Sequence, residues 1–231
     1  MTLGIMQPYF LPYIGYWQLM ASVDQFVVYD NIEYTKKGWI NRNRILQNDT
    51  ASYVTIPLKK GSDFLHIADR SVADDFDRRR MVDRVVTAYR RAPQFSTVLP
   101  LIESVLLAQT TNLFAYLLNS LQVIATFLEI QTPIVVSSTV PINKTLRAEQ
   151  RVLAICHALG AIRYRNAIGG QALYSPTTFG AEGVHLEFIR SRTIEYAQFG
   201  GAFEANLSIL DVMMFNSKGS VQAMLGAFDI V

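Results

Sequence analysis

Residues 2–30 read TLGIMQPYFLPYIGYWQLMASVDQFVVYD and decide the fold. A short apolar run occupies residues 2–6 and ends before Pro8, and apolar residues then recur at helical spacing from Tyr13 to Val23. Residues 25–30 form a second compact apolar run. We therefore expect a strand, a proline-bounded turn, a helix and a second, parallel strand, joined by a right-handed crossover.

The same alternation of strands and helices returns after Pro133. Strands are predicted over residues 134–138, 161–166 and 184–189, and helices over residues 146–159 and 208–215, the first of them closed by Gly160. Five strands with helical crossovers predict an α/β fold with a Rossmann-like, doubly wound, mostly parallel sheet. In such sheets ligands bind beyond the carboxyl ends of the strands. The candidate site is therefore expected near Gln7, where the first strand ends.

The middle of the chain follows other patterns. Residues 39–60 alternate as a β-hairpin about Asn48-Asp49, which we interpret as an insertion laid over the sheet. Residues 75–131 are predicted as a helical lobe, with a charged helix near 78–91, a break at Ala92-Pro93, and apolar-faced helices near 99–108 and 112–127. We expect residues 1–231 to form a single α/β domain, because no linker or low-complexity tract interrupts them.

Composition excludes several classes of partner. The 231 residues carry 21 basic and 19 acidic side chains, and a net charge of +2 gives no overall attraction to nucleic acid or to an anionic membrane. The longest apolar tract, Leu113 to Ile130, contains polar residues and is expected to be a core helix, without membrane insertion. The first residues lack the basic start of a signal peptide, so we expect a cytoplasmic protein.

Cysteine and histidine usage argues against a metal centre. Cys156 is the single cysteine and lies in a predicted helix, so no disulfide forms within the chain. His66, His157 and His185 stand singly and lack the spacing of metal ligands. No metal site is expected, and the sequence indicates neither a cofactor nor an oligomeric state.

The densest polar cluster lies at the start of the predicted hairpin. Guanidinium groups bind phosphate oxygens through two parallel hydrogen bonds, and an indole ring stacks on a base or sugar. In an extended segment, Asn41 and Asn43 would face one side, whereas Arg42 and Arg44 would share the other with Ile40. A solvated hairpin face is the alternative. With the first strand's end, this cluster supplies the first group of candidate substrate-binding residues: Gln7, Phe10, Tyr13, Tyr34, Lys36, Trp39, Asn41, Arg42 and Arg44.

Two further polar groups follow later strands. Asn143, Lys144, Thr145 and Arg147 precede a predicted helix, where Thr145 or Asn143 would cap it and its free amides would favour an anion. Simple capping with surface charges is the alternative. Gly169 and Gly170 end a strand and allow close approach of a ligand, although a turn with positive φ explains them equally well. Tyr174 and Asn206 complete the candidate substrate-binding residues.

Three carboxylates are candidates for a general base. Asp30 ends the second predicted strand, and Glu204 and Asp211 flank the start of the last predicted helix, where we expect Ser208 to be the cap. A carboxylate that enters a cleft beside arginines can accept a proton from an attacking amine or hydroxyl. An ion pair is the alternative role for each.

Several strings of this chain resemble the WbqC-like family of bacterial proteins. They are residues 6–16 (MQPYFLPYIGY), 24–30, 39–45 (WINRNRI), 147–150, 169–170 and 203–211. The resemblance covers nearly the whole chain. It implies a role near bacterial surface polysaccharide, O-antigen included, and near the modification of sugar nucleotides.

The resemblance and the residues together favour an enzyme. We expect a transferase that modifies an amino sugar or a related nucleotide- or phosphate-linked precursor, with Arg42, Arg44, Lys144 and Arg147 on the phosphates. A non-catalytic module that binds a nucleotide-sugar or a partner of the same pathway is the alternative. A third reading follows from a more distant similarity to nucleotidyltransferase-like folds, whose strand-end motif Pro-x-His-x-Gly-His binds phosphates. This chain has tyrosines in place of both histidines, in residues 12–16.

Overall fold

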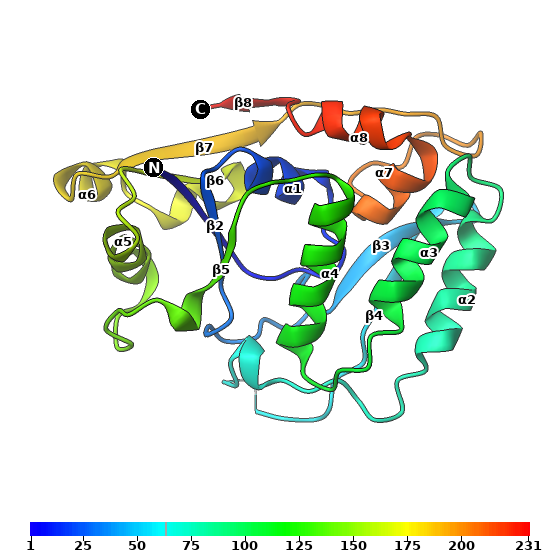
Figure 1. The fold of residues 1–231 in the computed structure, drawn as a ribbon, viewed down its shortest axis with the longest axis horizontal. Coiled ribbons are helices and arrows are strands. Elements are labelled where there is room, and N and C mark those ends of the chain that lie inside the picture. The colour runs from blue at the N-terminus through cyan, green and yellow to red at the C-terminus, as the bar shows by residue number, and fades with distance from the viewer. Residues whose placement is uncertain (63) are drawn as a thin grey trace.

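The computed structural model describes residues 1–62 and 64–231, and within them six strands form one sheet (Figure 1). Their order across the sheet is β5-β2-β1-β6-β7-β8. The strands comprise β1 (Thr2–Met6), β2 (Gln25–Val28), β5 (Ile134–Val136), β6 (Arg163–Ala167), β7 (His185–Ser191) and β8 (Phe228–Ile230). All neighbouring pairs are parallel except β7 with β8. The five predicted strands and the mostly parallel sheet are confirmed, and β8 is an antiparallel edge strand that the sequence analysis missed.

The order of the parallel strands creates a point where the chain turns away in opposite directions. From β1 the chain continues through α1 (Ile14–Ala21) to β2 on one side, and from β6 it continues through α6 (Pro176–Ala181) to β7 on the other. β1 and β6 are neighbours in the sheet, so the chain segments that leave their carboxyl ends run in opposite directions. Such a point is where open parallel sheets bind ligands.

Helices cover both faces of the sheet. The alternation of side chains along β2 sends Phe26 and Val28 into one apolar cluster and Val27 into another. The first cluster includes α1 and three later helices, α2 (Arg78–Tyr89), α3 (Phe95–Leu106) and α4 (Leu113–Phe127). The second includes α5 (Ala148–Ala158) and α6. Figure 1 shows α5 and α6 at the left of the molecule and α2–α4 at the right.

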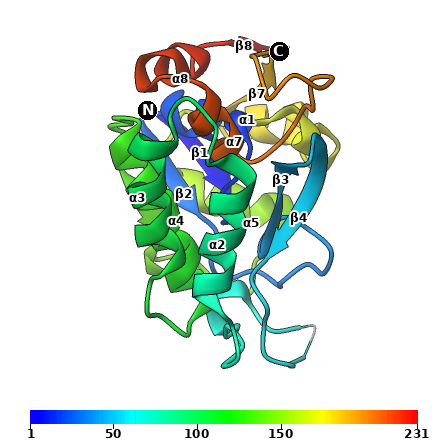
Figure 2. The same ribbon diagram turned by 90° about the vertical axis from the view of Figure 1, so that its right-hand side faces the viewer.

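The predicted hairpin is confirmed. β3 (Arg42–Gln47) and β4 (Thr50–Thr55) pair antiparallel in a separate sheet, joined by the two-residue turn Asn48-Asp49. Both turn residues have positive φ, 53° and 58°, which Asn and Asp tolerate better than most residues. Figure 2 shows the hairpin on the opposite side of the molecule from α3 and α4.

The helical segment contains the three expected helices, α2 (Arg78–Tyr89), α3 (Phe95–Leu106) and α4 (Leu113–Phe127). α3 begins four residues before the predicted start, because Pro100 lies inside the helix and does not interrupt it. Asn112 caps α4 by accepting a hydrogen bond from the amide of Ala115. Within the described residues, no helix is both long and apolar enough to cross a membrane.

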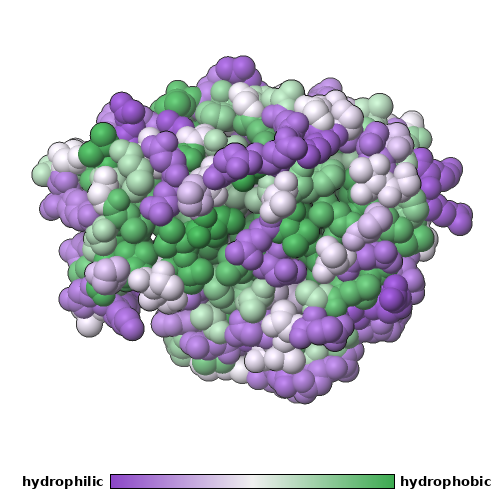
Figure 3. Space-filling model, in the orientation of Figure 1, coloured by the Kyte–Doolittle hydropathy of each residue, from purple (hydrophilic) through white to green (hydrophobic). Residues whose placement is uncertain are grey.

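The C-terminal part holds α7 (Ile209–Phe215) and α8 (Lys218–Met224), and short 3-10 helices η1 (Ile67–Asp69), η2 (Ser137–Thr139) and η3 (Ile168–Leu173) occur earlier. Ser208 caps α7 as predicted, and Gly160 ends α5 with a φ of 68°. The sequence analysis missed α6 and α8. The surface in Figure 3 alternates between hydrophilic margins and apolar areas across the middle of this face.

Candidate functional site

The turn after β1 is held from two remote parts of the chain, residues 39–43 and Ser208. Leu11 has a φ of 44°, which is unusual for a residue with a Cβ. Its carbonyl accepts hydrogen bonds from Asn43 Nδ2 (2.8 Å) and from Ser208 Oγ (2.7 Å). The amide of Phe10 donates to the carbonyl of Trp39 (3.1 Å). Three of the strings that resemble the family, residues 6–16, 39–45 and 203–211, therefore meet at this turn.

Three cavities in the described part of the chain share one side chain, that of Tyr13. The first, the hairpin cavity, has a volume of about 250 Å³. The second, the switch-point cavity, has a volume of about 380 Å³. The third, the C-terminal cavity, has a volume of about 320 Å³. Tyr13 is 37% exposed, and burial of its ring raises the pKa of its hydroxyl.

Each cavity is defined by its lining. The hairpin cavity is lined by Tyr9, Pro12, Tyr13, Trp39, Asn43, Arg44 and Asn206. The lining of the switch-point cavity includes Met6, Gln7, Tyr9, Tyr13, Tyr29, Asn166, Gly169, Gly170 and Tyr174. The lining of the C-terminal cavity includes Tyr13, Ser191, Glu195, Tyr196, Phe203 and Asn206.

The hairpin cavity gathers an arginine and an exposed aromatic ring. Trp39 stacks on Tyr53 with ring centroids 6.2 Å apart, and the Cζ of Arg44 lies 5.8 Å from the ring centre of Trp39. Arg44 Nη2 donates to the carbonyl of Asn206 (3.1 Å), whereas its buried Nε has no hydrogen-bond partner. The structure thus brings together four predicted residues: Tyr13, Trp39, Arg44 and Asn206.

Other predicted residues of the hairpin region line none of these three cavities. Asn41 is 9% exposed, donates to the carbonyl of Ile56 (2.8 Å) and accepts from the hydroxyl of Tyr34 (2.7 Å). Arg42 donates to the carbonyls of Gly38 and Lys37 and stacks on Tyr53. These bonds fix the base of the hairpin.

Lys36 lies exposed on the loop before the hairpin and lines none of the three cavities either. The alternation of faces is as expected for the arginines and asparagines, but Ile40 departs from it. Ile40 is 1% exposed and belongs to the core, because it precedes the strand and turns inward.

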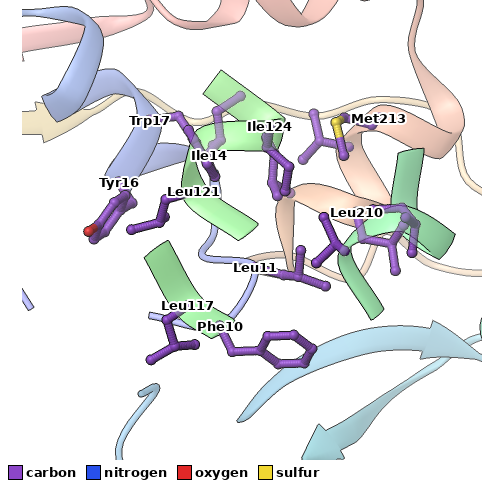
Figure 4. Close-up of a cluster of buried hydrophobic side chains, with 14 of the residues drawn as sticks. Phe10, Leu11, Ile14, Tyr16, Trp17, Leu117, Leu121, Ile124, Leu210 and Met213 are labelled. Atoms are coloured by element: carbon purple, nitrogen blue, oxygen red, sulfur yellow. The ribbon is translucent and has the colours of Figure 1, made fainter. Parts of the chain in front are cut away.

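Phe10 is a core residue, not a wall of the site. Its side chain has no exposed surface and packs 6.3 Å from the ring of Tyr116. Figure 4 shows Phe10 and Leu11 among side chains of α4 and α7, including Leu117 and Leu210. The turn points its apolar residues inward and leaves Tyr9 and Tyr13 for the cavities.

The switch-point cavity gathers a second set of predicted residues, namely Gln7, Gly169, Gly170 and Tyr174, together with Tyr13. The proposal that positive φ explains the two glycines is wrong, because neither has such a φ. A Cβ on Gly170 would lie 2.8 Å from Nδ2 of Asn166, whereas Gly169 faces open space. Close packing against Asn166 therefore accounts for Gly170.

The turn before α5 lies near the switch-point cavity but lines none of the three cavities. Asn143, Lys144, Thr145 and Arg147 are exposed. The capping role predicted for Asn143 or Thr145 is wrong, because Arg147 is the N-cap and Asn143 Oδ1 accepts instead from Thr145 (2.9 and 3.0 Å). Burial raises the pKa of the Tyr29 hydroxyl to about 12, and the positive charge of Arg147 lowers that pKa slightly.

Two of the three candidate general bases are occupied by structural hydrogen bonds. Asp30 is 4% exposed, and its Oδ1 accepts from Ser137 Oγ (2.7 Å) and from the amide of Ser138 (2.9 Å), which ties the end of β2 to η2. Asp211 has no exposed surface. A buried carboxylate in these settings stabilises the fold and does not reach a ligand.

Asp211 is the centre of a buried polar cluster. It accepts hydrogen bonds from the hydroxyls of Tyr89 and Tyr196, both 2.7 Å, and from Gln198 Nε2 (2.8 Å). Burial raises the pKa of Asp211, and the three donors oppose that shift.

Glu204 is the remaining candidate base. Its backbone bonds to Gln198, and no hydrogen bond or ion pair to its carboxylate occurs among residues 1–62 and 64–231. Its neighbours Phe203, Ala205 and Asn206 line the C-terminal cavity. Of the three acids, Glu204 alone is not buried, although it lines none of the three cavities itself.

Sequence reasoning missed Tyr9 and Tyr29 as lining residues, and Asn166 also lines the switch-point cavity. Tyr9 lines both the hairpin and the switch-point cavities, and burial raises its pKa. Tyr29 and Asn166 stand at the carboxyl ends of β2 and β6, and that position was the available signal. Among the described residues, no group of three or more His, Cys, Asp or Glu is arranged to hold a metal ion.

Comparison with known proteins finds a family whose model matches most of this chain. The family model described as "WbqC-like protein family" matches residues 7–223. The chain is also similar to the uncharacterized protein Rv1507c of Mycobacterium tuberculosis, with 28% identity over 218 residues, which is 92% of each chain. The matched region includes every cavity residue described above except Met6.

Proposed function

This chain belongs to the WbqC-like protein family, and on that premise we propose that it is a cytoplasmic enzyme of bacterial surface-polysaccharide (O-antigen) biosynthesis. It transfers a group to an amino sugar or to a related nucleotide- or phosphate-linked precursor. Its sheet is taken as Rossmann-like, with the ligand at the carboxyl edge of the strands. The observation that carries the proposal is the meeting of three cavities at Tyr13.

The hairpin cavity suits the carrier half of such a precursor. Trp39 offers an exposed ring face for a base or a sugar, and Arg44 lies beside it with an unpartnered Nε. A guanidinium next to an aromatic ring binds a phosphate while the ring stacks on the attached group. Gln7, Lys144 and Arg147 are assigned to the same ligand from the switch-point side.

Glu204 is assigned the role of general base. Its carboxylate accepts the proton of the attacking amine or hydroxyl as that group forms its bond to the transferred group. No side chain is assigned as a nucleophile, so transfer runs directly between two bound substrates. Tyr13, at the junction of the cavities, then stands between donor and acceptor.

A non-catalytic module that binds a nucleotide-sugar is the second candidate, and a specific observation favours it. Two of the three acids expected to act as bases, Asp30 and Asp211, are buried, and their carboxylate oxygens accept hydrogen bonds from other parts of the fold. A binding protein needs the cavities but needs no base.

The test separates binding from turnover. UDP- and dTDP-linked amino sugars are screened by thermal shift, and any that bind are incubated with acyl-coenzyme A or nucleotide-activated donors and analysed by mass spectrometry. We expect Glu204→Gln to retain binding and to lose at least about 100-fold in turnover. Glu103→Gln on α3, whose partner is an exposed Arg79, is the matched control.

Three outcomes are informative. Binding with turnover that depends on Glu204 supports the transferase. Binding without turnover for any donor supports the module. Binding that survives in both Trp39→Ala and Arg44→Gln places the ligand elsewhere and contradicts the assignment of the hairpin cavity.

A further inference from the structure

Arg151 on α5 is a buried cation without a counter-charge. The residue is 6% exposed, and its Nε is fully buried without a hydrogen-bond partner. Within residues 1–62 and 64–231, its guanidinium makes no side-chain hydrogen bond and no ion pair. Removing a guanidinium from water is costly unless acceptors or a negative charge replace the water, so buried charges are normally paired.

The side chain of Arg151 lies next to the switch-point cavity. Its Cζ is 5.2 Å from the centre of the Tyr29 ring, and Tyr29 lines that cavity. No acidic side chain lines the cavity. Glu149, in the first turn of α5, accepts instead from the amide of Ser175 (2.6 Å). The charge of Arg151 is therefore left uncompensated at this edge of the sheet.

The start of α5 adds to the positive potential. The helix has 11 residues, and its N-cap, Arg147, forms no side-chain capping bond. The first amides of a helix and its dipole favour an anion. Arg147 and Arg151 both act on Tyr29 and lower the pKa of its hydroxyl, against the larger effect of burial. Both arginines therefore act on Tyr29, which lines the cavity, although neither arginine is itself among the lining residues.

We propose that the switch-point cavity binds the oxyanion group of a small molecule and that Arg151 is its buried counter-charge. The ligand is a phosphate ester or a carboxylate, because both present paired oxygens to a guanidinium. The remaining walls supply hydroxyls and amides from Gln7, Asn166 and Tyr174, and a volume of about 380 Å³ holds a ligand of monosaccharide size. This site shares Tyr9 and Tyr13 with the hairpin cavity and Gln7 with the proposed function, but anion binding there does not depend on group transfer.

The test measures stabilisation by simple anions. Thermal unfolding of the full chain is followed with sodium phosphate, sulfate, acetate or chloride at matched ionic strength. We expect phosphate to raise Tm saturably, by about 3–5 °C at ten times its Kd. Arg151→Met keeps an unbranched, flexible side chain, though a shorter one, removes the charge and abolishes this shift.

The unliganded variant provides a second readout. If Arg151 served only packing, Arg151→Met would lower Tm without anion. If Arg151 is instead an unpaired buried charge, removing that charge leaves Tm unchanged or raises it. Arg151→Lys keeps a charge but lacks the planar fork, and we expect it to bind phosphate about tenfold more weakly than the wild type.

Arg70 is a matched control. It is also 6% exposed, lies over a tyrosine ring at 4.8 Å and has an unpartnered Nε. It differs because its terminal nitrogens donate to the carbonyls of Ser62 (3.1 Å) and Lys59 (3.4 Å). Arg70→Met is therefore expected to lower Tm and to keep the phosphate shift.

The outcomes decide the proposal. A shift that requires Arg151 supports it, and a larger response to phosphate or to acetate tells the ester from the carboxylate. The absence of a saturable shift, or a shift that survives in Arg151→Met, overturns it. Arg44→Gln separates the two proposals. This variant is expected to keep the phosphate shift that depends on Arg151, whether or not the hairpin cavity binds a sugar nucleotide.

Discussion

The ring of Tyr13 lies directly over Gly15, so closely that a Cβ at residue 15 would be 2.4 Å from the Cζ and Oη of the tyrosine. A glycine at the start of a helix leaves room for a ligand or another backbone to approach closely. The close approach is instead made by the side chain that all three cavities share. Gly15 therefore determines where Tyr13 stands.

Gly15→Ala is predicted to displace the Tyr13 ring toward solvent with little loss of stability, because that ring is already 37% exposed. Its hydroxyl then has a pKa closer to the ordinary value, since burial is the main cause of its rise. Nitration by tetranitromethane, mapped by mass spectrometry, should be several-fold faster at Tyr13. Gly219→Ala on α8, where a Cβ meets nothing within 4 Å, should leave the rate unchanged. Equal nitration in both variants would mean that the ring has another stable position.

Asn43→Ala is predicted to destabilise the protein by about 2–4 kcal/mol. Asn43 is 3% exposed, and its Nδ2 donates to the carbonyls of Phe10 (3.0 Å) and Leu11 (2.8 Å), which the variant leaves buried with fewer donors. The free energy of unfolding in urea measures the effect. Asn119→Ala on α4, a residue without a side-chain bond among the described contacts, should cost less than about 0.5 kcal/mol. Similar values for the two would show that the turn does not depend on Asn43.

Asp211 is predicted to make stability depend on pH in the direction opposite to that of an ion-paired acid. Burial raises its folded-state pKa above the ordinary value of 3.8, so the folded protein binds more protons than the unfolded chain between these two values. The contribution of this carboxyl is therefore largest below the unfolded pKa and is lost as pH rises through the folded pKa. The difference in unfolding free energy between wild type and Asp211→Asn should fall over that window and then level off. A difference that grows with pH would show that the three hydrogen bonds outweigh burial.

Cys156 is predicted to be inert toward thiol reagents in the folded protein. It has no exposed surface, and burial raises the pKa of its thiol to about 12, so the reactive thiolate is scarce at pH 8. Labelling with an aromatic disulfide should be at least about 100-fold slower than in guanidinium chloride. Rapid labelling of the native protein would reveal local opening of α5.

The pattern of apolar residues predicted the five parallel strands, the hairpin turn and most helices, because these depend on neighbours within a few residues. Asn48 and Asp49 illustrate this, since two residues that tolerate positive φ are enough to specify a tight hairpin turn. The elements that escaped prediction are α6, α8 and β8, which are short. Too few residues repeat in them for a period to be recognised.

Polar residues proved harder to assign than apolar ones. The candidate residues Tyr13, Trp39, Arg44 and Asn206 line one cavity, whereas Asn41 is equally polar and is committed to Tyr34 and Ile56. Asn41 and the residues that line the cavity occur in similar local sequences. What separates them is the partner across the fold, which spacing does not reveal.

The sequence alone determined the α/β class, the parallel strands and the resemblance to a family, and it indicated the carboxyl edge as the expected place of a site. Only the tertiary structure decided that Asp30 and Asp211 serve the fold, that Tyr13 joins three cavities and that Arg151 lies buried without a partner. The physical reason is that periodicity records which way a side chain faces. The free energy of a buried charge or amide depends instead on the groups that long-range packing brings to it.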